Sequence, residues 1–279
     1  MKTLELSVYN RKITIEEMAK IIDHTNLRPY AKKEEIKKLC DEAIEYNFGA
    51  VCVNSSYVLY AYNILKNTEI KIAAVVGFPL GACTSETKAF ETKNAIELGA
   101  EEIDMVLNVG FFRDGEYDFI KNDIQQVVSA AGGAKVKVIL ETGFLTDEQI
   151  VKACDISKQA GAHYVKTSTG FGPMGAYYDH VYLMKQTVGN ELGIKAAGGI
   201  RDAQKAVLLV NAGATRIGAS ASVNIIKTLK DELEKGTWFE DKNIPDNELY
   251  SWGAADPKKQ PKEVYDYYIQ KKEKHFDTK

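Results

Sequence analysis

The 279-residue sequence lacks the features that mark membrane, secreted and nucleic-acid-binding proteins. No apolar run approaches the ~20 residues needed to cross a bilayer. The first twelve residues carry no apolar core followed by a small-residue cleavage site, so we expect no secretory signal. The 36 basic and 39 acidic side chains give a net charge of −3. That balance argues against a protein that binds a nucleic-acid backbone, which would need a basic stripe.

Cysteine is also scarce, and its spacing excludes two further classes of protein. The chain has four cysteines and no CxxC pair; they are Cys40, Cys52, Cys83 and Cys154. Such spacing fits neither a disulfide framework nor a cysteine zinc site. No cluster of His, Asp and Glu has metal-ligand spacing either. We therefore expect reduced thiols, a cytoplasmic location and no metal site.

What the chain does contain is a repeated unit: a short apolar run, a polar or glycine-rich corner, and a longer amphipathic stretch. β-branched and apolar runs of this kind are typical of parallel strands buried on both faces. Eight such runs are predicted to be strands: Ile21–Leu27, Ala50–Asn54, Lys71–Phe78, Glu102–Asn108, Val136–Thr142, His163–Thr169, Ile194–Gly198 and Thr215–Ser220.

Helices are predicted between these runs from apolar residues at helical spacing, at Lys33–Tyr46, Ser85–Leu98 and Asp147–Ala160. Thr146 has the position and chemistry of an N-cap for the last of them. Glycines that follow helical stretches are predicted to end them with positive φ; they are Gly49, Gly99, Gly161 and Gly213. Eightfold alternation of strand and helix predicts an α/β fold, a (β/α)8 barrel. A doubly wound open sheet is the alternative, disfavoured because no GxGxxG corner follows the first strand.

The composition changes near residue 235. Residues 1–235 are predicted to form the barrel, and residues 236–279 a polar, Tyr- and Lys-rich C-terminal extension. Within it, Glu263–Lys274 is predicted to be a short helix. We expect the extension to pack on the outside of the barrel or on a neighbouring subunit; covering the active site is the alternative.

Two lysines are the strongest candidates for chemistry. Side chains alternate along a strand between the barrel interior and the helices, so Lys166 is predicted to point inward, and Lys195 lies on the next strand. Burial and a neighbouring ammonium both lower the pKa of a lysine. A lysine held neutral in this way is a Schiff-base nucleophile.

A carboxylate and a rival lysine accompany the pair. Asp104 is predicted to point inward, where it could relay protons as an imine forms, or serve only as a counter-ion. Lys137 and Glu141 are predicted to point inward on the fifth strand, and spacing does not exclude Lys137 as the Schiff-base lysine. At the end of the first strand, Asp23 and Thr25 are predicted to line the pocket.

Glycine-rich corners follow the last strands of the predicted barrel. Loops after the seventh and eighth strands commonly form a phosphate site in this fold, because backbone N–H groups can approach an anion there. The corners are Gly198-Gly199-Ile200-Arg201 and Gly218-Ala219-Ser220, and Gly170-Phe171-Gly172 after the sixth strand is a third of the same kind; together they predict a phosphorylated substrate.

Taken in order, these segments resemble the deoxyribose-phosphate aldolase family, a class I aldolase family of deoxynucleoside catabolism. The resemblance runs from about residue 20 to about residue 226. It rests on Ile22-Asp23-His24-Thr25, Val51-Cys52-Val53-Asn54, Val75-Val76-Gly77-Phe78-Pro79-Leu80-Gly81, Glu102-Ile103-Asp104-Met105-Val106, Lys137-Val138-Ile139-Leu140-Glu141-Thr142, Val165-Lys166-Thr167-Ser168-Thr169-Gly170-Phe171-Gly172, Lys195-Ala196-Ala197-Gly198-Gly199-Ile200-Arg201 and Arg216-Ile217-Gly218-Ala219-Ser220.

The resemblance implies reversible cleavage of 2-deoxy-D-ribose 5-phosphate into D-glyceraldehyde 3-phosphate and acetaldehyde, with no cofactor. It implies that Lys166 forms the imine, that Lys195 lowers its pKa and that Asp104 moves protons through a water. It also implies that Thr25, Cys52 and Thr169 line the pocket. The residues that it implies hold the phosphate are Gly170, Gly198, Gly199, Arg201, Gly218, Ser220 and Ala221. A homo-oligomer, either a dimer or a tetramer, is expected.

The chain departs from the family pattern at two places near the pocket. Ser222 stands where glycine is common, and Tyr177-Tyr178 belongs to a bulkier corner than usual. These departures motivate an alternative, a Schiff-base aldolase for a different or unphosphorylated aldehyde. A non-catalytic sugar-phosphate sensor is a third hypothesis, and retention of the two lysines with the aspartate argues against it.

Overall fold

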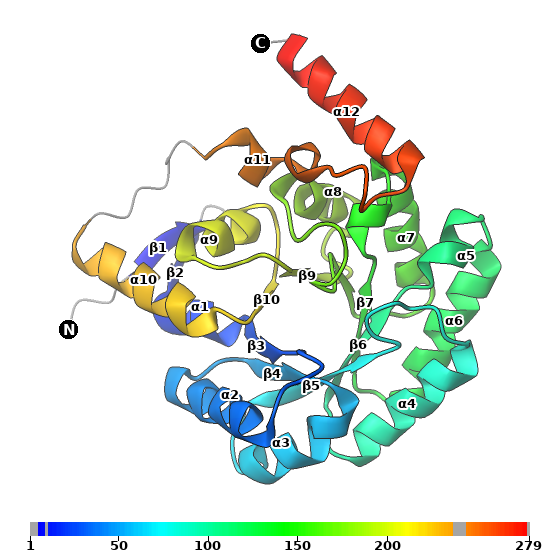
Figure 1. Cartoon of the computed structure of the whole chain (residues 1–279). Helices are drawn as coiled ribbons and strands as arrows, with labels where there is room; N and C mark the ends of the chain where they lie inside the picture. The colour runs from blue at the N-terminus through cyan, green and yellow to red at the C-terminus, as the bar shows by residue number, and fades with distance from the viewer. Residues whose placement is uncertain (1–4, 9–10, 237–243, 278–279) are drawn as a thin grey trace.

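Eight parallel strands close into a barrel in the computed structural model, which describes residues 5–8, 11–236 and 244–277 (Figure 1). The strand order around the barrel is β10-β3-β4-β5-β6-β7-β8-β9, so strands that are neighbours in the chain are neighbours in space. The predicted (β/α)8 barrel is confirmed. The strands are β3 (Ile22–Asn26), β4 (Ala50–Val53), β5 (Lys71–Val76), β6 (Glu102–Val106), β7 (Lys135–Ile139), β8 (Tyr164–Lys166), β9 (Gly193–Ala197) and β10 (Arg216–Ala219).

Helices surround the barrel on its outside (Figure 1). The α-helices between and after the strands are α2 (Lys33–Tyr46), α3 (Val58–Leu65), α4 (Ser85–Glu97), α5 (Val109–Arg113), α6 (Tyr117–Ala130), α7 (Asp147–Gln159), α8 (Tyr178–Val188), α9 (Ala203–Asn211) and α10 (Ser222–Glu234). No described helix has both the length and the apolar character that crossing a bilayer requires.

Alternation along the strands separates an apolar outer layer from a mixed interior. Ile103 and Met105 of β6 belong to the apolar core between strands and helices, whereas Asp104 between them is fully buried on the other face. Inside the barrel, Cys52 and Val75 belong to a small apolar cluster. The predicted orientation of Asp104 follows from this period of two.

Two predictions about helix ends have different outcomes. Thr146 caps α7, because its hydroxyl accepts from the backbone N–H of Gln149, whose side chain accepts from the N–H of Thr146. The prediction that Gly49 ends α2 with positive φ is wrong. Asn47 takes the left-handed conformation at φ 54° instead. Gly49 is needed for close packing, because a Cβ there would lie 2.1 Å from the carbonyl oxygen of Lys20.

Two strands and a helix at the N-terminus were not predicted. An antiparallel hairpin of β1 (Glu5–Val8) and β2 (Arg11–Thr14) leads into α1 (Ile15–Lys20), which begins with a capping box at Thr14. The hairpin lies apart from the barrel sheet. Its strands have four residues each, shorter than the apolar runs from which the barrel strands are predicted. The alternation of polar and apolar residues over Glu5–Val8 was the available signal.

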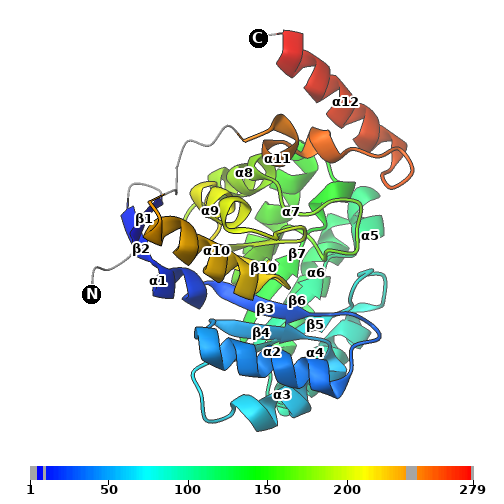
Figure 2. The ribbon, with the colours of Figure 1, turned by 60° about the vertical axis from the view of Figure 1, so that its left-hand side comes forward.

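Residues 244–277 form two short helices and a longer one on one side of the barrel (Figure 2). They are α11 (Asp246–Leu249), the 3-10 helix η3 (Ser251–Ala254) and α12 (Lys262–Asp277). The helix predicted at Glu263–Lys274 is therefore present and slightly longer. The boundary at residue 235 stays a prediction, since residues 237–243 lie outside the described residues.

A buried ion pair between α4 and α6 gives a test of the packing. Lys88 Nζ lies 2.6 Å from Asp123 Oδ2, and both side chains are fully buried. Lys88→Met leaves an unpaired buried carboxylate, so we expect urea unfolding to show a loss of about 3–5 kcal/mol. The double variant Lys88→Met/Asp123→Leu should recover most of that loss. Lys93→Met, at an exposed position of the same helix, is the control; a loss no larger than the control's would contradict the account.

Candidate active site

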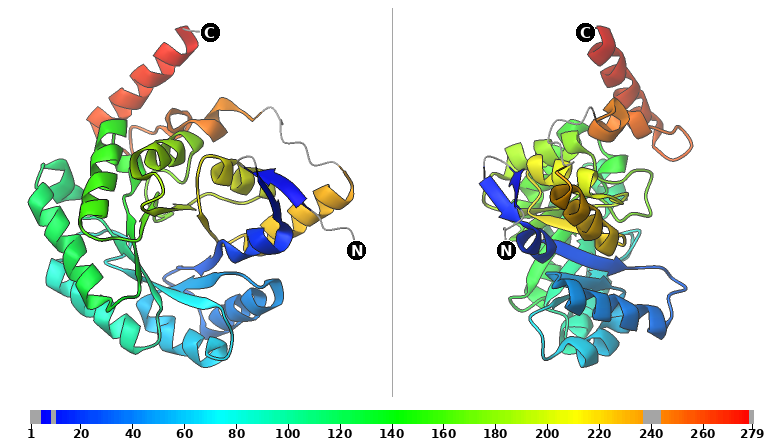
Figure 3. Two further views of the ribbon diagram at one scale, coloured as in Figure 1. Left: turned by 180° about the vertical axis from the view of Figure 1, so that it is seen from behind. Right: turned by 90° about the vertical axis from the view of Figure 1, so that its left-hand side faces the viewer.

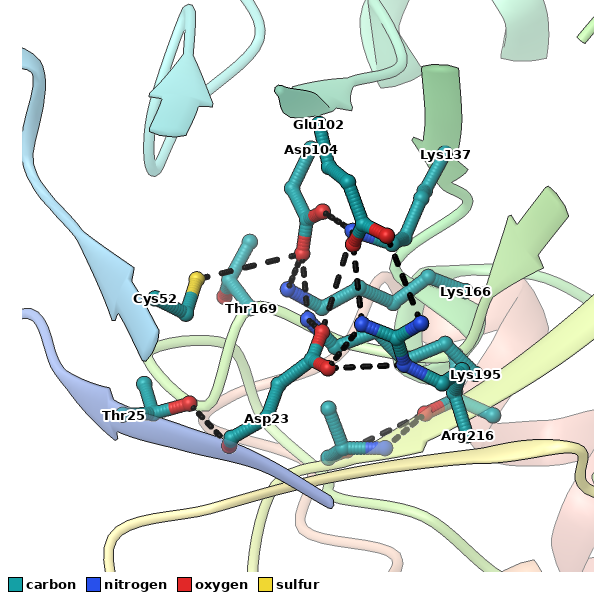
Figure 4. A network of polar contacts seen from close by, with 12 residues as sticks. Asp23, Thr25, Cys52, Glu102, Asp104, Lys137, Lys166, Thr169, Lys195 and Arg216 are labelled. Carbon is teal, nitrogen blue, oxygen red and sulfur yellow. Dashed lines mark hydrogen bonds and ion pairs between the residues drawn. The ribbon is translucent and has the colours of Figure 1, made fainter. Parts of the chain in front are cut away.

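The carboxylate of Asp104 lies at the centre of the charged part of the barrel interior (Figure 4). Three lysine amines contact it from the three strands that follow β6. Lys137 Nζ lies 2.7 Å from Oδ1, while Lys166 Nζ and Lys195 Nζ lie 2.8 and 2.7 Å from Oδ2. All four side chains are buried. The predicted meeting of Lys166 and Lys195 with Asp104 therefore exists in the structure.

Strand register and one glycine bring these groups together. Asp104 pairs with Lys137 across β6 and β7, and Lys166 pairs with Lys195 across β8 and β9, so each pair shares one level of the barrel. Gly218 of β10 leaves space beside them. A Cβ at that position would lie 2.9 Å from the Cε of Lys195 and would displace its chain.

A second tier of charges supports Asp104 from below. Lys195 Nζ lies 2.5 Å from Asp23 Oδ2, and Lys137 Nζ lies 2.7 Å from Glu102 Oε2. Arg216 joins the two carboxylates: its Nε donates to Asp23 over 2.8 Å and its Nη2 to Glu102 over 2.9 Å. The sequence analysis missed Arg216 and Glu102 as part of the site. The alternation of side chains along a strand was the available signal. Arg216 lies on the same face of β10 as Gly218, and Glu102 lies on the same face of β6 as Asp104.

The charges of this network do not balance. Four cationic side chains, Lys137, Lys166, Lys195 and Arg216, contact three carboxylates, those of Asp23, Glu102 and Asp104. Lys137 and Lys195 each contact two or more of these carboxylates, whereas Lys166 contacts Asp104 alone. Lys166 is therefore the cation that the network supports least.

The pKa shifts follow from this arrangement. Burial lowers the pKa of Lys166 below its ordinary 10.5; Asp104 opposes the shift and Lys195 adds to it. Burial also acts on Lys195 and Lys137, but Asp104 and the other carboxylates outweigh it and raise both pKa values above 10.5. Burial alone would raise the pKa of Asp104, yet the three lysines hold it well below 3.8. Lys166 is thus the amine that loses its proton most readily.

A cavity of about 460 Å³ opens onto Lys166 at the ends of the strands. Among the described residues, Lys166 is the one lysine of the three that lines it. Lys137 and Lys195 are held beneath, against carboxylates. The lining residues are His24, Thr25, Asn26, Leu27, Arg28, Glu35, Lys38, Leu39, Glu42, Lys166, Thr169, Gly170, Phe171, Ala197, Gly198, Gly199, Ile200, Arg201, Gly218, Ala219 and Ser220.

Most of the other predicted site residues are also brought to this cavity. Those that line it are Thr25, Thr169, Gly170, Gly198, Gly199, Arg201, Gly218 and Ser220. Asp23, Cys52 and Ala221 are outside the described lining. Asp23 belongs to the charged tier below, and Cys52 lies in the inner apolar cluster with its Sγ 4.0 Å from Asp104 Oδ2. Burial raises the pKa of the Cys52 thiol, which favours its unreactive form.

The predicted inward orientation of Glu141 has a specific consequence. Its buried carboxylate accepts from both the hydroxyl and the backbone N–H of Thr169, and the hydroxyl of Thr169 in turn accepts from the N–H of Phe171. Burial raises the pKa of Glu141 above 4.5. Glu141 therefore positions the corner of the cavity that follows β8, and it does not contact the lysines through a hydrogen bond or ion pair among the described residues.

The residues of the two departures noted in the sequence are outside the described lining of the cavity. The hydroxyl of Ser222 donates to the carbonyl oxygen of Ala219 over 2.8 Å, and the side chain is fully buried. The ring of Tyr177 packs with the aromatic cluster of the C-terminal helices. The departures that motivated a different aldehyde substrate therefore add no side chain to the described cavity lining.

Removing the central carboxylate tests the electrostatic account. In Asp104→Asn the amines lose a partner that raises their pKa values, while buried positive charge stays. We expect a loss of about 3–5 kcal/mol in the free energy of unfolding at pH 7. Below pH 10.5 the unfolded variant binds more protons than the folded one, so its stability should rise with pH and the loss should shrink.

Urea unfolding at several pH values provides the measurement. Asp41→Asn is the matched control, because Asp41 is half exposed and pairs with Lys37 on the surface of α2. It should change stability by less than about 0.5 kcal/mol. An Asp104→Asn variant as stable as this control, or one whose deficit grows with pH, would contradict the account.

Comparisons with known proteins agree with this geometry. The family model described as DeoC/LacD family aldolase matches residues 17–228. The deoxyribose-phosphate aldolase of Aciduliprofundum boonei is 57% identical over 216 residues, which are 77% of this chain and 97% of the relative. That of Thermococcus kodakarensis is 56% identical over 220 residues, 77% of this chain and 98% of the relative.

A solved structure extends the likeness to three dimensions. The tetrameric deoxyribose phosphate aldolase of Aeropyrum pernix is 34% identical, with a TM-score of 0.74 over 78% of this chain and 92% of that one. The resemblance that the motifs indicated is thereby confirmed. The chain belongs to the DeoC/LacD family of aldolases.

Proposed function

We propose that this protein is a class I aldolase that reversibly cleaves 2-deoxy-D-ribose 5-phosphate to D-glyceraldehyde 3-phosphate and acetaldehyde. One observation carries the proposal. Of three buried lysines around Asp104, Lys166 alone reaches the cavity, and it is the one whose pKa is lowered. The names of the relatives supply the substrate, because the relatives from A. boonei and T. kodakarensis are deoxyribose-phosphate aldolases.

Imine formation uses the neutral amine of Lys166. Its nitrogen attacks the C1 aldehyde of the open-chain sugar and forms a carbinolamine, which loses water to give the imine. Asp104 Oδ2, 2.8 Å from the Lys166 nitrogen, can accept and return the protons of these steps, directly or through a water. Lys195 stays charged on the same oxygen and keeps Asp104 ionised between transfers.

Cleavage then breaks the bond between C2 and C3. The C3 hydroxyl gives up its proton, the C3–O bond becomes a carbonyl, and the electron pair of the broken bond moves into an enamine on Lys166. D-glyceraldehyde 3-phosphate leaves. Protonation of the enamine at C2 and hydrolysis of the imine release acetaldehyde and restore the lysine. Electrons and protons balance without an outside oxidant, so no cofactor is needed.

The phosphate is proposed to bind opposite Lys166, at the glycine corners. Gly198 and Gly199 have φ angles of 93° and 70°, conformations that glycine adopts cheaply. Such corners aim backbone N–H groups at an anion. Ser220 and Arg201 line the same cavity and can add a hydroxyl donor and a positive charge.

Two measurements separate the proposed function from its alternatives. A relative preference for unphosphorylated deoxyribose would favour the aldolase with a different aldehyde, and sugar-phosphate binding without turnover would favour the sensor.

We also propose a homo-oligomer, a dimer or a tetramer, for which the tetrameric A. pernix enzyme is the precedent. A cytoplasmic location stays a prediction; it is compatible with the four free thiols.

Borohydride trapping tests the nucleophile. Incubation with acetaldehyde followed by reduction should add one two-carbon unit to Lys166, located by peptide mass spectrometry. Lys166→Met should lose that label and lower kcat on the order of a thousandfold or more, because the covalent route is removed. Lys37→Met, on the surface of α2, should keep both. Label on Lys137 or Lys195 instead, or near-normal turnover in Lys166→Met, would overturn the assignment.

A further inference from the structure

The C-terminal segment, residues 244–277, lies beyond everything that the family match explains. The family model ends at residue 228, and the A. boonei relative is 97% covered by a match that takes in 77% of this chain. The segment nevertheless packs in an ordered way. Figure 3 shows α12 at the periphery of the ring of helices, and no described residue of the segment lines the cavity.

Two polar side chains of the segment bind the chain that follows β7. The hydroxyl of Tyr268 donates to the carbonyl oxygen of Leu145 over 2.9 Å and lies 2.6 Å from His180 Nε2. The amide of Gln260 donates to the carbonyl oxygen of Gly143 over 2.9 Å. Tyr268 is fully buried and Gln260 is 7% exposed. These are internal contacts of the fold rather than loose surface contacts.

The segment also contacts the loop between β8 and α8, residues 167–177, and the beginning of α8. Met174 in this loop is buried against Trp252, Val264 and Tyr268. Gln260 Nε2 lies 3.6 Å from its sulfur. At the beginning of α8, Asp179 accepts hydrogen bonds from the N–H and hydroxyl of Ser251. The loop is thus held at its middle and just after its end.

The opposite side of the same loop forms the cavity wall. Thr169, Gly170 and Phe171 line the cavity. Next to Met174, the backbone of the loop touches the proposed phosphate corner: the N–H of Ala176 donates to the carbonyl oxygen of Gly198 over 3.0 Å. A Cβ on Gly175 would lie 2.2 Å from that oxygen. Met174 and Gly175 therefore join the segment on one side to Gly198 on the other.

The composition of the loop explains why it needs such support. Gly170, Gly172 and Gly175 lie within its eleven residues, 167 to 177. Glycine loses more conformational entropy on ordering than any other residue. Contacts that order such a loop before binding reduce the entropic cost of binding an anion there.

We propose that the C-terminal segment is a brace that sets the β8–α8 loop and the Gly198 corner in position for the phosphate group, with Tyr268 and Gln260 as positioning residues. This rests on the proposed function for the identity of the phosphorylated substrate. The brace acts on phosphate binding and leaves imine formation untouched, because Lys166 and its partners lie on the strands.

A matched pair of double variants of the full chain tests the brace. Tyr268→Phe/Gln260→Ala removes the hydroxyl and the amide that make the polar contacts with Leu145, His180, Gly143 and Met174. Tyr265→Phe/Gln270→Ala makes the same chemical changes on α12, at a half-buried tyrosine whose hydroxyl has no hydrogen bond within the described residues and at an exposed glutamine. Tyr268→Phe alone replaces the first variant if the double change prevents folding.

We expect the brace variant to raise KM for 2-deoxyribose 5-phosphate and Kd for inorganic phosphate together, about three- to tenfold, the size of one lost hydrogen bond. The borohydride-trapping rate with acetaldehyde should equal that of the parent and of the control variant.

An unchanged phosphate Kd, even with a lower melting temperature, would reduce the segment to a stabilising role and overturn the proposal. A parent chain that binds no phosphate would also overturn it. Because phosphate titration needs no turnover, a parent that binds phosphate without cleaving the sugar refutes the proposed function and leaves the brace testable.

Discussion

One carboxylate shared by three buried ammonium groups determines how the interior of this barrel is organised. Asp104 contacts the amines of Lys137, Lys166 and Lys195 within 2.8 Å, at a depth where water does not screen charge. Burying any of these amines alone would cost several kcal/mol. The carboxylates of Asp23 and Glu102 offset that cost for Lys137 and Lys195, whose pKa values are raised above 10.5. Of these three lysines, Lys166 contacts Asp104 alone among the described carboxylates, and it is the one that lines the cavity.

The rest of the fold makes this arrangement possible. The apolar core lies outside the strands, between barrel and helices, so stability does not depend on filling the interior with hydrophobic side chains. The interior can then divide into a small apolar cluster around Cys52 and a charged half around Asp104. Closure of the barrel brings β10 beside β3, which places Arg216 against Asp23 at the base of the charged half. The reactivity of Lys166 thus depends on how cationic and carboxylate side chains are distributed across the whole barrel interior.

Sequence alone predicted the parts of this account that depend on local periodicity. Alternation along a strand identified Asp104 and Lys166 as inward residues, and neighbouring strands predicted that Lys195 would meet Lys166. Contacts across the barrel were beyond such reasoning. Arg216 and Asp23 are 193 residues apart and meet only because the barrel closes in one register. For the same reason Asp23 and Cys52, predicted to line the pocket, were not recognised as parts of the layer beneath it. Nor does periodicity show that Tyr268 on α12 would reach the carbonyl of Leu145.

The most direct test of the central claim is to observe the protonation of the three amines in the resting protein. Lysine labelled with 13C at Cε and 15N at Nζ can be titrated by NMR, with the three signals assigned from the Lys→Arg variants at positions 137, 166 and 195. The account predicts that Lys166 deprotonates below pH 10.5 while Lys137 and Lys195 remain ammonium ions above it. A Lys195 or Lys137 signal that titrates before that of Lys166 would contradict it.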